Sequence, residues 1–467
     1  MKKRILVTIV GQGSIIHLIR TGIIDELKLF CEPVIALLWQ QNDLMEELRK
    51  KNFEVYIIPA YKTTAEYSDL RNKINRWYQK NILKSPSTEI QEKFLDQYKN
   101  FNQKFLRDIR KIVLNVKSLF IPGYIKKIIS KEDAILRDEK VWQTYSKWID
   151  EIKVDGLYTV TPFLKEIELI ARIMKRHNKP LLAAIHSFDN VTKRGWPAIF
   201  FDHYLVWNKH NKQEMQRINS QLKDDDITIM GAPQFDFHFS EIKNINKAEW
   251  FAAKGLPNDK KIILYSGGSV HLFPNEPQYL QHLNNAIKNN ELQNCVILFR
   301  SHPLDKMQRW KDAIGESEFI IYDEAPSGKE NMDHTNVTME NIYNLIATLA
   351  FTDVHINLCS TMTVDGSVFN KPQIGPAYDD FSSRKNEKLL KQMYYQEHFL
   401  PVLKTNVLQL AQSKTQLIAL VKNALSQKLF SKEISKACVE EIITFTDGKS
   451  AKRAVLAVKT FFSSNTN

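Results

Sequence analysis

The sequence predicts an α/β protein of two doubly wound, Rossmann-like domains that face each other across a cleft, with a helical insertion in the first domain. Three observations support this fold class. Short apolar segments typical of buried strands alternate with amphipathic helical segments, which indicates βαβ units and parallel sheets. The alternation breaks at Gly231–Asp236 and then starts again. The length of 467 residues exceeds what one hydrophobic core usually supports.

The first domain, residues 1–240, follows the alternating pattern from its start. The expected strands are Arg4–Val10, Val34–Leu38, Glu54–Ile58, Gly156–Val160, Pro180–Ile185, Tyr204–Trp207 and Ile227–Met230. The expected helices are Ile15–Phe30, Leu44–Lys51 and Pro162–His177. Residues 63–148 interrupt the pattern with a helical, basic and aromatic stretch, which we interpret as an insertion outside the sheet.

The second domain, residues 241–467, repeats the alternation. The expected strands are Lys261–Tyr265, Cys295–Arg300, Phe319–Tyr322 and Val354–Leu358. The expected helices are Tyr279–Lys288, Met339–Ala350 and Met362–Phe369. A helical tail is expected from about Lys388, and its last helix could cross back to the first domain.

The composition is that of an ordinary globular protein, with 43% apolar and 25% charged residues. The cysteines are scattered and form no CxxC pair, which fits a reducing compartment with cysteines as small core residues. The apolar run after the basic start, Ile5–Val10, is too short for a secretory signal, and no run is long enough to span a bilayer. A cytoplasmic protein is expected.

The formal net charge of +12 calls for a partner such as a phosphate ligand, anionic lipid or nucleic acid. Lys104–Lys131 combines many basic residues with apolar residues at helical spacing, as a basic amphipathic helix does. It is either a solvated helix face or an attachment to the anionic inner face of the plasma membrane. Nucleic acid is not expected, because no recognised RNA motif, zinc knuckle or helix-turn-helix appears.

Polar loops follow the strands of the second domain, where parallel α/β sheets bind phosphates. Gly267, Gly268 and Ser269 follow one strand, and the two glycines would let the backbone approach a ligand closely. Arg300 and His302 stand at the end of the next, where His302 could bind a phosphate or a ribose. A simple turn and an ordinary surface histidine are the alternatives.

The strongest candidate for an anion site is Ser360-Thr361, which precedes a predicted helix. Its alternative is a plain N-cap, a role that Ser and Thr fill routinely. Asp365, about one turn into this helix, either binds a ribose hydroxyl or is an ordinary polar residue.

In the first domain, the Gly11–Ser14 turn matches neither a dinucleotide fingerprint nor a Walker loop. His17 follows it and would be either a general base at the cleft or a solvent-facing residue. A second polar cluster follows the strand that ends at Ile185, and it is either a solvated loop or a contact for acceptor or phosphate. The candidates in this cluster are His186, Asp189, Lys193 and Arg194.

Taken in order, these motifs resemble the GT-B glycosyltransferases of bacterial surface polysaccharide synthesis. The matching elements are the first β-turn-helix, DNVTKRG, GAPQFD at the hinge, strand-Gly-Gly, RSHP and CSTMTVDGSVFNKPQIG. The last two also resemble the CDP-glycerol polyol-phosphate transferases and the bacterial sialyl- and Kdo-type transferases. UDP-GlcNAc 2-epimerases share the hinge and the two-domain plan. The resemblance covers most of the chain outside residues 63–148 and is strongest over 296–376.

This resemblance implies a UDP-, CDP- or CMP-linked sugar donor on the second domain, held by His302, Ser360 and Thr361 with help from Gly267 and Gly268. It implies a glycan or lipid-linked acceptor near Gly13, His17 and Asp189, with His17 or Asp189 as the catalytic base. No cofactor and no metal are implied, because helix dipoles and basic groups stabilise the leaving diphosphate. The acid for the donor ribose stays open between Asp365 and Glu340.

The sequence therefore favours a glycosyltransferase of lipopolysaccharide, capsule or related glycan assembly. A polyol-phosphate transferase and a sugar-nucleotide 2-epimerase are the alternative enzymes on the same fold. A nucleic-acid-binding protein is the non-enzyme alternative, and only the net charge suggests it.

Overall fold

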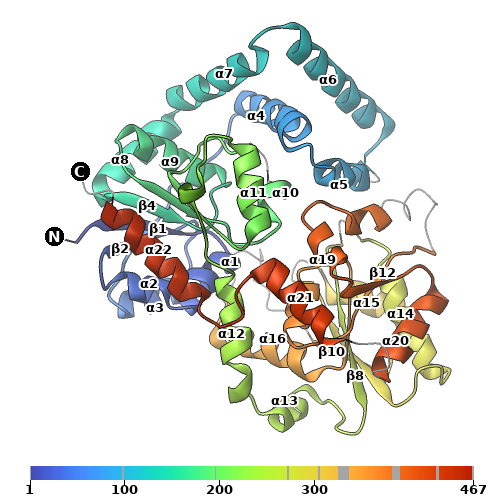
Figure 1. Ribbon diagram of the computed structural model, residues 1–467. Helices are drawn as coiled ribbons and strands as arrows, with labels where there is room; N and C mark the ends of the chain where they lie inside the picture. Colours follow the sequence, from blue (N-terminus) through green and yellow to red (C-terminus); the bar gives the residue numbers. More distant parts are fainter. Residues whose placement is uncertain are drawn as a thin grey trace. The chain divides into compact units, whose positions relative to one another are not determined.

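A computed structural model describes residues 2–96, 99–194, 196–270, 273–302, 305–323, 336–380, 390–426 and 431–464. The chain forms two compact units (Figure 1). The first holds residues 1–88, 96–234 and 449–467, and the second holds 89–95 and 235–448. Residues 449–467, assigned to the second domain from the sequence, thus belong with the first unit.

The first unit is built on a parallel sheet with strand order β3-β2-β1-β4-β5-β6-β7. Its strands are β1 (Arg4–Ile9), β2 (Glu32–Leu37), β3 (Glu54–Ile57), β4 (Gly156–Thr159), β5 (Leu181–Ala184), β6 (His203–Val206) and β7 (Ile227–Ile229). Its helices outside the insertion are α1 (Gln12–Ser14), a π-helix (Ile15–Arg20), α2 (Ile23–Leu27), α3 (Asn42–Lys50), α9 (Lys165–Arg176), α10 (Asn190–Lys193), α11 (Lys209–Ile218) and α22 (Ser450–Ser464). The strand order reverses beside β1 and β4, which makes their carboxyl ends the switch point of the sheet.

The second unit repeats this plan with the parallel order β10-β9-β8-β11-β12-β13. Its strands are β8 (Lys261–Ser266), β9 (Cys295–Arg300), β10 (Ile320–Asp323), β11 (Val354–Asn357), β12 (Gln373–Pro376) and β13 (Leu408–Ala411). Its helices are α12 (Asp236–Ser240), α13 (Lys247–Lys254), α14 (Pro277–Lys288), α15 (Met307–Ile314), α16 (Met339–Phe351), α17 (Met362–Val368), α19 (Leu400–Lys404), α20 (Lys414–Leu425) and α21 (Lys432–Ile443). The switch point here lies beside β8 and β11, and the predicted fold class is confirmed.

Two element predictions are wrong. The helix expected over 15–30 is broken at Gly22, whose φ of 77° lies in the left-handed region, so that α2 starts as a separate helix. The tail expected to be helical from about Lys388 contains β13, and β12 was also missed; both strands extend the edge of the second sheet. The last helix, α22, packs against α2 of the first unit. This agrees with the expectation that the last helix of the tail could cross back to the first domain.

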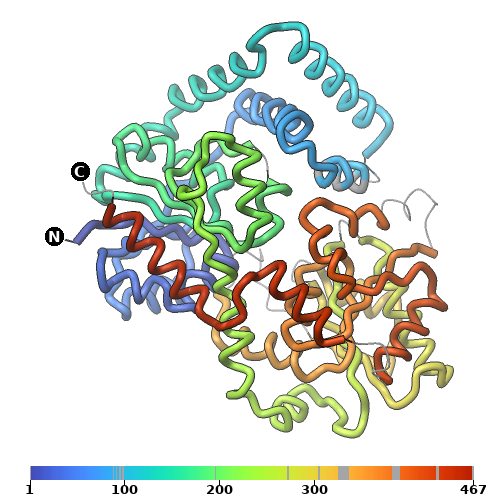
Figure 2. The backbone as a smooth tube through the Cα atoms, viewed as in Figure 1, coloured from blue at the N-terminus to red at the C-terminus, as the bar shows by residue number. Residues whose placement is uncertain are grey.

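The insertion between β3 and β4 is helical, as predicted. It consists of α4 (Ala65–Tyr78), a π-helix (Gln79–Leu83), α5 (Ser87–Leu95), α6 (Phe101–Phe120), α7 (Tyr124–Asp138) and α8 (Lys140–Ile152). Figure 2 traces α6 and α7 as two arms joined by a tight turn. Helix α4 packs on both α6 and α7, and α8 packs on α9 of the sheet layer.

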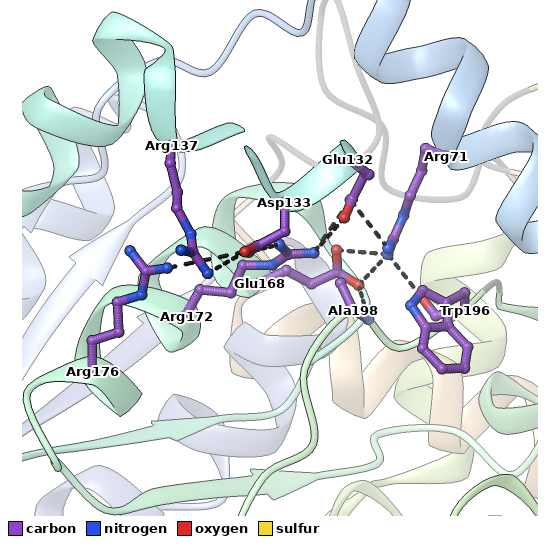
Figure 3. Close-up of polar contacts among 9 residues, drawn as sticks. All are labelled: Arg71, Glu132, Asp133, Arg137, Glu168, Arg172, Arg176, Trp196 and Ala198. Carbon is purple, nitrogen blue, oxygen red and sulfur yellow. Dashed lines mark hydrogen bonds and ion pairs between the residues drawn. The ribbon is translucent and has the colours of Figure 1, made fainter. Parts of the chain in front are cut away.

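A buried ion cluster fastens this insertion to α9 (Figure 3). Arg71 of α4 donates to both carboxylate oxygens of Glu168, at 2.6 and 2.7 Å. Arg172, one turn further along α9, pairs with Glu132 of α7 at 2.9 Å and with Asp133 at 2.8 Å. Glu132 and Glu168 are almost fully buried, and burial raises the pKa of Glu168. Removing one partner would leave a buried charge unpaired, at a cost of about 3–5 kcal/mol.

Candidate functional site

His186 follows β5 in the first unit and is held from three sides. Its Nδ1 lies 3.1 Å from the carbonyl oxygen of Val160, and its own carbonyl accepts a 2.9 Å hydrogen bond from Gln234 Nε2. A Cβ atom on Gly13 would come within 2.8 Å of the His186 ring, so Gly13 leaves the space that the ring fills.

These contacts set the hydrogen-bonding state of the imidazole. A carbonyl oxygen only accepts, so Nδ1 of His186 must carry the hydrogen of the bond to Val160. In the neutral ring, Nε2 then carries the lone pair and can accept a proton. The side chain is half-buried, and the Cδ2–Nε2 edge of its ring faces Gly13. His186 therefore has the tautomer of a general base.

His17 differs from both interpretations made from the sequence. It is fully buried in the π-helix, so the interpretation as a solvent-facing residue is wrong. Burial, together with repulsion by the neighbouring His186, lowers the pKa of His17 to about 3. Neither ring nitrogen makes a hydrogen bond of normal geometry with a described residue, although the Gln234 side chain lies near enough to oppose the shift. His17 is thus a neutral ring behind His186.

Asp189, the other candidate base, is part of a local polar network. Its carboxylate accepts from Ser187 Oγ at 2.6 Å and from Asn190 Nδ2 at 3.0 Å, and it pairs with Lys193 at 2.8 Å. Arg194, at the end of α10, is exposed. These contacts fix the position of the carboxylate, with Lys193 close beside it.

The Gly-Gly loop of the second unit follows β8, at the switch point. The amide of Gly267 donates to the Arg300 carbonyl, and the amide of Gly268 donates to both carboxylate oxygens of Glu276, at 2.9 Å each. A Cβ on Gly267 would lie 3.2 Å from the Trp310 ring and 3.4 Å from the His302 amide. Gly267 therefore allows close packing beside His302, and Gly268 allows it against Phe273 and Glu276. The N–H groups of both glycines are already used within the protein.

Glu276, at the start of α14, is the residue that sequence reasoning missed. It is buried behind the loop, and Tyr265 Oη donates to it at 3.2 Å. Burial raises the pKa of Glu276 to about 8, against the opposing effect of the Gly268 amide. In the sequence, an acidic residue directly before Pro277 indicates only the start of a helix. Nothing there suggested that Glu276 would bind the Gly-Gly loop.

His302 comes after β9 and is half-buried; Pro303, which follows it, lies outside the described residues. Burial lowers the pKa of His302, and nearby Asp305 opposes that shift. The preceding strand residue, Arg300, was a candidate for donor binding. Its guanidinium is buried and pairs at 2.6 Å with Asp323 of β10, which also holds Lys254.

Ser360 and Thr361 lie between β11 and α17, at the same switch point as the Gly-Gly loop. Ser360 Oγ accepts a 3.2 Å hydrogen bond from the amide of Met362, the first residue of α17. The N-cap position itself is Thr361, whose side chain makes no capping hydrogen bond. The amides of Ser360 and Thr361 donate to no described residue, and the Thr361 side chain is exposed. The amides of Ser360 and Thr361 and the Thr361 hydroxyl therefore remain as candidates to bind an anion.

Asp365, one turn into α17, has a partner that the sequence did not suggest. Its Oδ1 lies 3.0 Å from Nε2 of His238, a buried residue of α12. The His238 ring stacks on Phe235 at 4.8 Å and on Phe369 at 5.6 Å between centroids. The GAPQFD motif just before His238 marked this region in the sequence but not this contact.

Within the described residues, no group of three or more His, Cys, Asp and Glu side chains is placed to hold a metal ion. All four cysteines are free, and Cys31, Cys295 and Cys438 are buried. Of the helices in the described ranges, none combines the length and apolar character needed to cross a membrane.

Comparison with known proteins identifies the class. A putative UDP-N-acetylglucosamine 2-epimerase from Listeria monocytogenes matches with a TM-score of 0.56 and 12% identity, covering 100% of this chain and 98% of that one. The 2-epimerase from Neisseria meningitidis bound to UDP-GlcNAc matches with 0.55 and 9% identity, covering 98% and 100%. A glycosyltransferase from Rickettsia africae matches with 0.52 and 11% identity, covering both chains fully. These likenesses establish a GT-B fold.

The family follows from the sequence itself. The family model of the CDP-glycerol:poly(glycerophosphate) glycerophosphotransferases matches residues 177–460, more than half of the chain. The chain therefore belongs to this family of transferases. No curated protein sequence matches it.

Proposed function

We propose that this protein transfers glycerol phosphate from CDP-glycerol to a hydroxyl group of a poly(glycerophosphate) acceptor. The family match carries the proposal, because it includes both His186 of the first unit and every candidate donor-binding residue of the second. Of the enzymes considered from the sequence, the polyol-phosphate transferase is thus favoured over the glycosyltransferase and the 2-epimerase.

In the transfer step, the acceptor oxygen attacks the phosphorus that bears glycerol and forms a new P–O bond. The bond between that phosphorus and the bridging oxygen breaks, and CMP leaves with the electron pair. The acceptor proton passes to Nε2 of His186. The Nδ1–H bond to Val160 supports this role, because it keeps the lone pair on Nε2 before the reaction and stabilises the imidazolium afterwards.

The donor side of the proposal rests on the second unit. His302 and the two amides at Ser360 and Thr361 would hold the diphosphate of the donor, because amides at a helix start favour negative charge. Gly267, which packs against the Trp310 ring and the His302 amide, would let the loop run close beside His302. Asp365 is already paired with His238, so its proposed role is to orient the donor ribose rather than to take part in the reaction.

We also propose that the protein works at the inner face of a plasma membrane. The basic and apolar composition of residues 104–131 supports this location.

The test is ligand-induced stabilisation followed by product analysis. CDP-glycerol and CMP should raise the melting temperature, and incubation with CDP-glycerol and a short glycerol phosphate oligomer should release CMP and lengthen the oligomer. Stabilisation by UDP- or CMP-sugars, with none by CDP-glycerol, would favour a glycosyltransferase of surface polysaccharide synthesis. Conversion of UDP-GlcNAc to its 2-epimer would favour the epimerase.

A further inference from the structure

The loop after α10 carries an exposed arginine. Arg194 stands directly after α10, and its amide donates to the Asn190 carbonyl. Its guanidinium forms no ion pair or hydrogen bond with any residue that the structure describes. Lys193, its neighbour, differs, because its ammonium pairs with Asp189 at 2.8 Å. Of these two cations, Arg194 is therefore the one with a charge to offer a ligand.

Helix α4 of the insertion holds this loop just beyond Arg194. Arg71 and Asn75 lie one turn apart on α4. Arg71 donates to the carbonyl of Trp196 at 2.7 Å (Figure 3). The amide of Trp196 in turn donates to Asn75 Oδ1, also at 2.7 Å. Both backbone polar groups of Trp196 are thus bonded to α4, two residues after Arg194.

Ring packing and a further hydrogen bond fix this part of the loop. The Trp196 indole packs edge-to-face against Tyr78 of α4, with 4.9 Å between the ring centroids. The amide of Ala198 donates to Glu168 at 3.2 Å, which joins the loop to the buried ion cluster. Because two residues span at most about 7 Å, these contacts keep the backbone of Arg194 close to α4.

The candidate base stands at the other end of the same segment. His186, whose Nδ1 is bonded to the Val160 carbonyl, begins the stretch that runs into α10. Within this stretch, the carbonyl of Phe188 accepts a 2.8 Å hydrogen bond from Asn211 of α11. The backbone at Arg194 therefore lies between two anchored points. A ligand with a hydroxyl group close to an anionic group would match this segment.

We infer that Arg194 binds the phosphate nearest the attacking hydroxyl of the acceptor, and that α4 positions this side chain through Trp196. The inference rests on the proposed function, in which the acceptor is a poly(glycerophosphate). In such a chain a single glycerol unit separates the terminal hydroxyl from the next phosphodiester, so an acceptor seated on His186 carries a negative charge close by. A guanidinium suits this group, because its planar fork can donate two parallel hydrogen bonds to a phosphate.

Binding of the acceptor in the absence of donor tests the contact. The probe is a short glycerol phosphate oligomer, titrated calorimetrically into the protein at low ionic strength. Arg194→Gln should bind it about tenfold more weakly than the wild type does, the value of one hydrogen bond to a charged group, and added salt should reduce the difference. Arg49→Gln, at an exposed arginine of α3, is the matched control and should bind like the wild type.

Two further ligands show whether the contact is specific for the acceptor phosphate. An oligoglycerol with the same number of glycerol units but no phosphate should bind equally to Arg194→Gln and to the wild type. The affinity for CDP-glycerol should also be the same in both. A loss of affinity for CDP-glycerol as large as the loss for the oligomer would place Arg194 with the donor and overturn the inference.

The positioning role of α4 is tested at Asn75. Asn75→Ala removes the oxygen that accepts from the Trp196 amide and should weaken oligomer binding several-fold, whereas Asn75→Asp keeps an oxygen there and should restore the affinity. In the Arg194→Gln background, Asn75→Ala should cause no further loss, because it acts through Arg194. Fully additive losses would show that Asn75 acts elsewhere and would overturn the positioning role.

Two results would overturn the inference as a whole. They are an oligomer that does not bind the wild type and an Arg194→Gln variant that binds it as the wild type does. The proposed transfer is judged separately, by release of CMP from CDP-glycerol in the wild type. Oligomer binding that depends on Arg194, without release of CMP, would count against the transfer reaction and leave the phosphate contact standing.

Discussion

The two strand-end sites, one in each unit, differ in what they offer a substrate. In the first unit, a half-buried imidazole is fixed by a carbonyl oxygen and backed by a second, fully buried imidazole. In the second unit, amides and one hydroxyl gather at a helix start beside a glycine loop, and a buried acid holds that loop from behind. The first arrangement suits proton transfer, and the second suits the binding of an anion.

This difference shows how one fold, used twice, divides the work of a transfer reaction. Both sites lie at the carboxyl ends of parallel strands, where the backbone geometry is the same. What distinguishes them is the residue placed behind the site. Burial keeps both uncharged near neutral pH, because it lowers the pKa of His17 and raises the pKa of Glu276. They differ in their contacts, since Glu276 accepts hydrogen bonds from the Gly268 amide and the Tyr265 hydroxyl, whereas neither ring nitrogen of His17 makes one of normal geometry with a described residue.

The sharpest test of the proton-transfer site is His186→Gln. Loss of the base should lower kcat for glycerol phosphate transfer by about 10²- to 10⁴-fold, while KM for CDP-glycerol changes little. Steady-state kinetics with both substrates would measure the split. His177→Gln, at an exposed histidine after α9, is the control and should have no effect. A normal kcat in His186→Gln would show that His186 is not the base, and the first unit would then have no assigned proton-transfer site.

The acid behind the glycine loop predicts a pH dependence of stability. The pKa of Glu276 is raised from 4.5 to about 8 in the folded protein, so the folded state binds the proton more tightly than the unfolded state. This contribution to stability is complete below the unfolded pKa and is lost as pH rises through the folded pKa. Wild-type stability should therefore fall, relative to Glu276→Gln, by about 3 kcal/mol between pH 5 and 8.

Denaturant unfolding of both proteins across that pH range measures this difference. The glutamine keeps an oxygen that can accept the Gly268 amide, so the loop should stay formed in the variant. Curves that stay parallel from pH 5 to 8 would show that Glu276 does not titrate there.

The smallest expected effect concerns the anion site. His302→Ala should weaken CDP-glycerol binding by about tenfold, the value of one hydrogen bond to a charged group, without lowering the melting temperature of the ligand-free protein. Isothermal titration gives the affinity, and His177→Ala serves as the control. Unchanged affinity would reject the phosphate role of His302 and leave Ser360 and Thr361 as the only support for that half of the comparison.

Much of the fold could be predicted because buried strands and amphipathic helices leave strong patterns. Cys295–Arg300 was predicted with its observed bounds. Strand β12, Gln373–Pro376, was missed because glycine and proline within four residues argue against a strand. They are tolerated because β11 pairs only with Gln373 and Ile374, which leaves Gly375 and Pro376 paired with β13 alone. The break in the helix over 15–30 depends on Gly22, which the surrounding apolar pattern hides.

The candidate site was harder to predict than the fold. The sequence marked the strand ends and hence His186, His302 and Ser360. It could not show that His17 is buried, because a histidine among isoleucines and leucines on a short helix fits a buried or an exposed position equally well. The sequence also could not show that Arg300 pairs with Asp323, or that Asp365 pairs with His238, because each partner comes from another element.

The ion cluster that joins α4 and α7 to α9 has a consequence for motion. Arg71 of α4 pairs with Glu168 of α9, and Arg172 of α9 pairs with Glu132 of α7. The insertion could not swing on the first sheet without separating these buried charges. Helices α4 and α7 should therefore move together with α9 as one body.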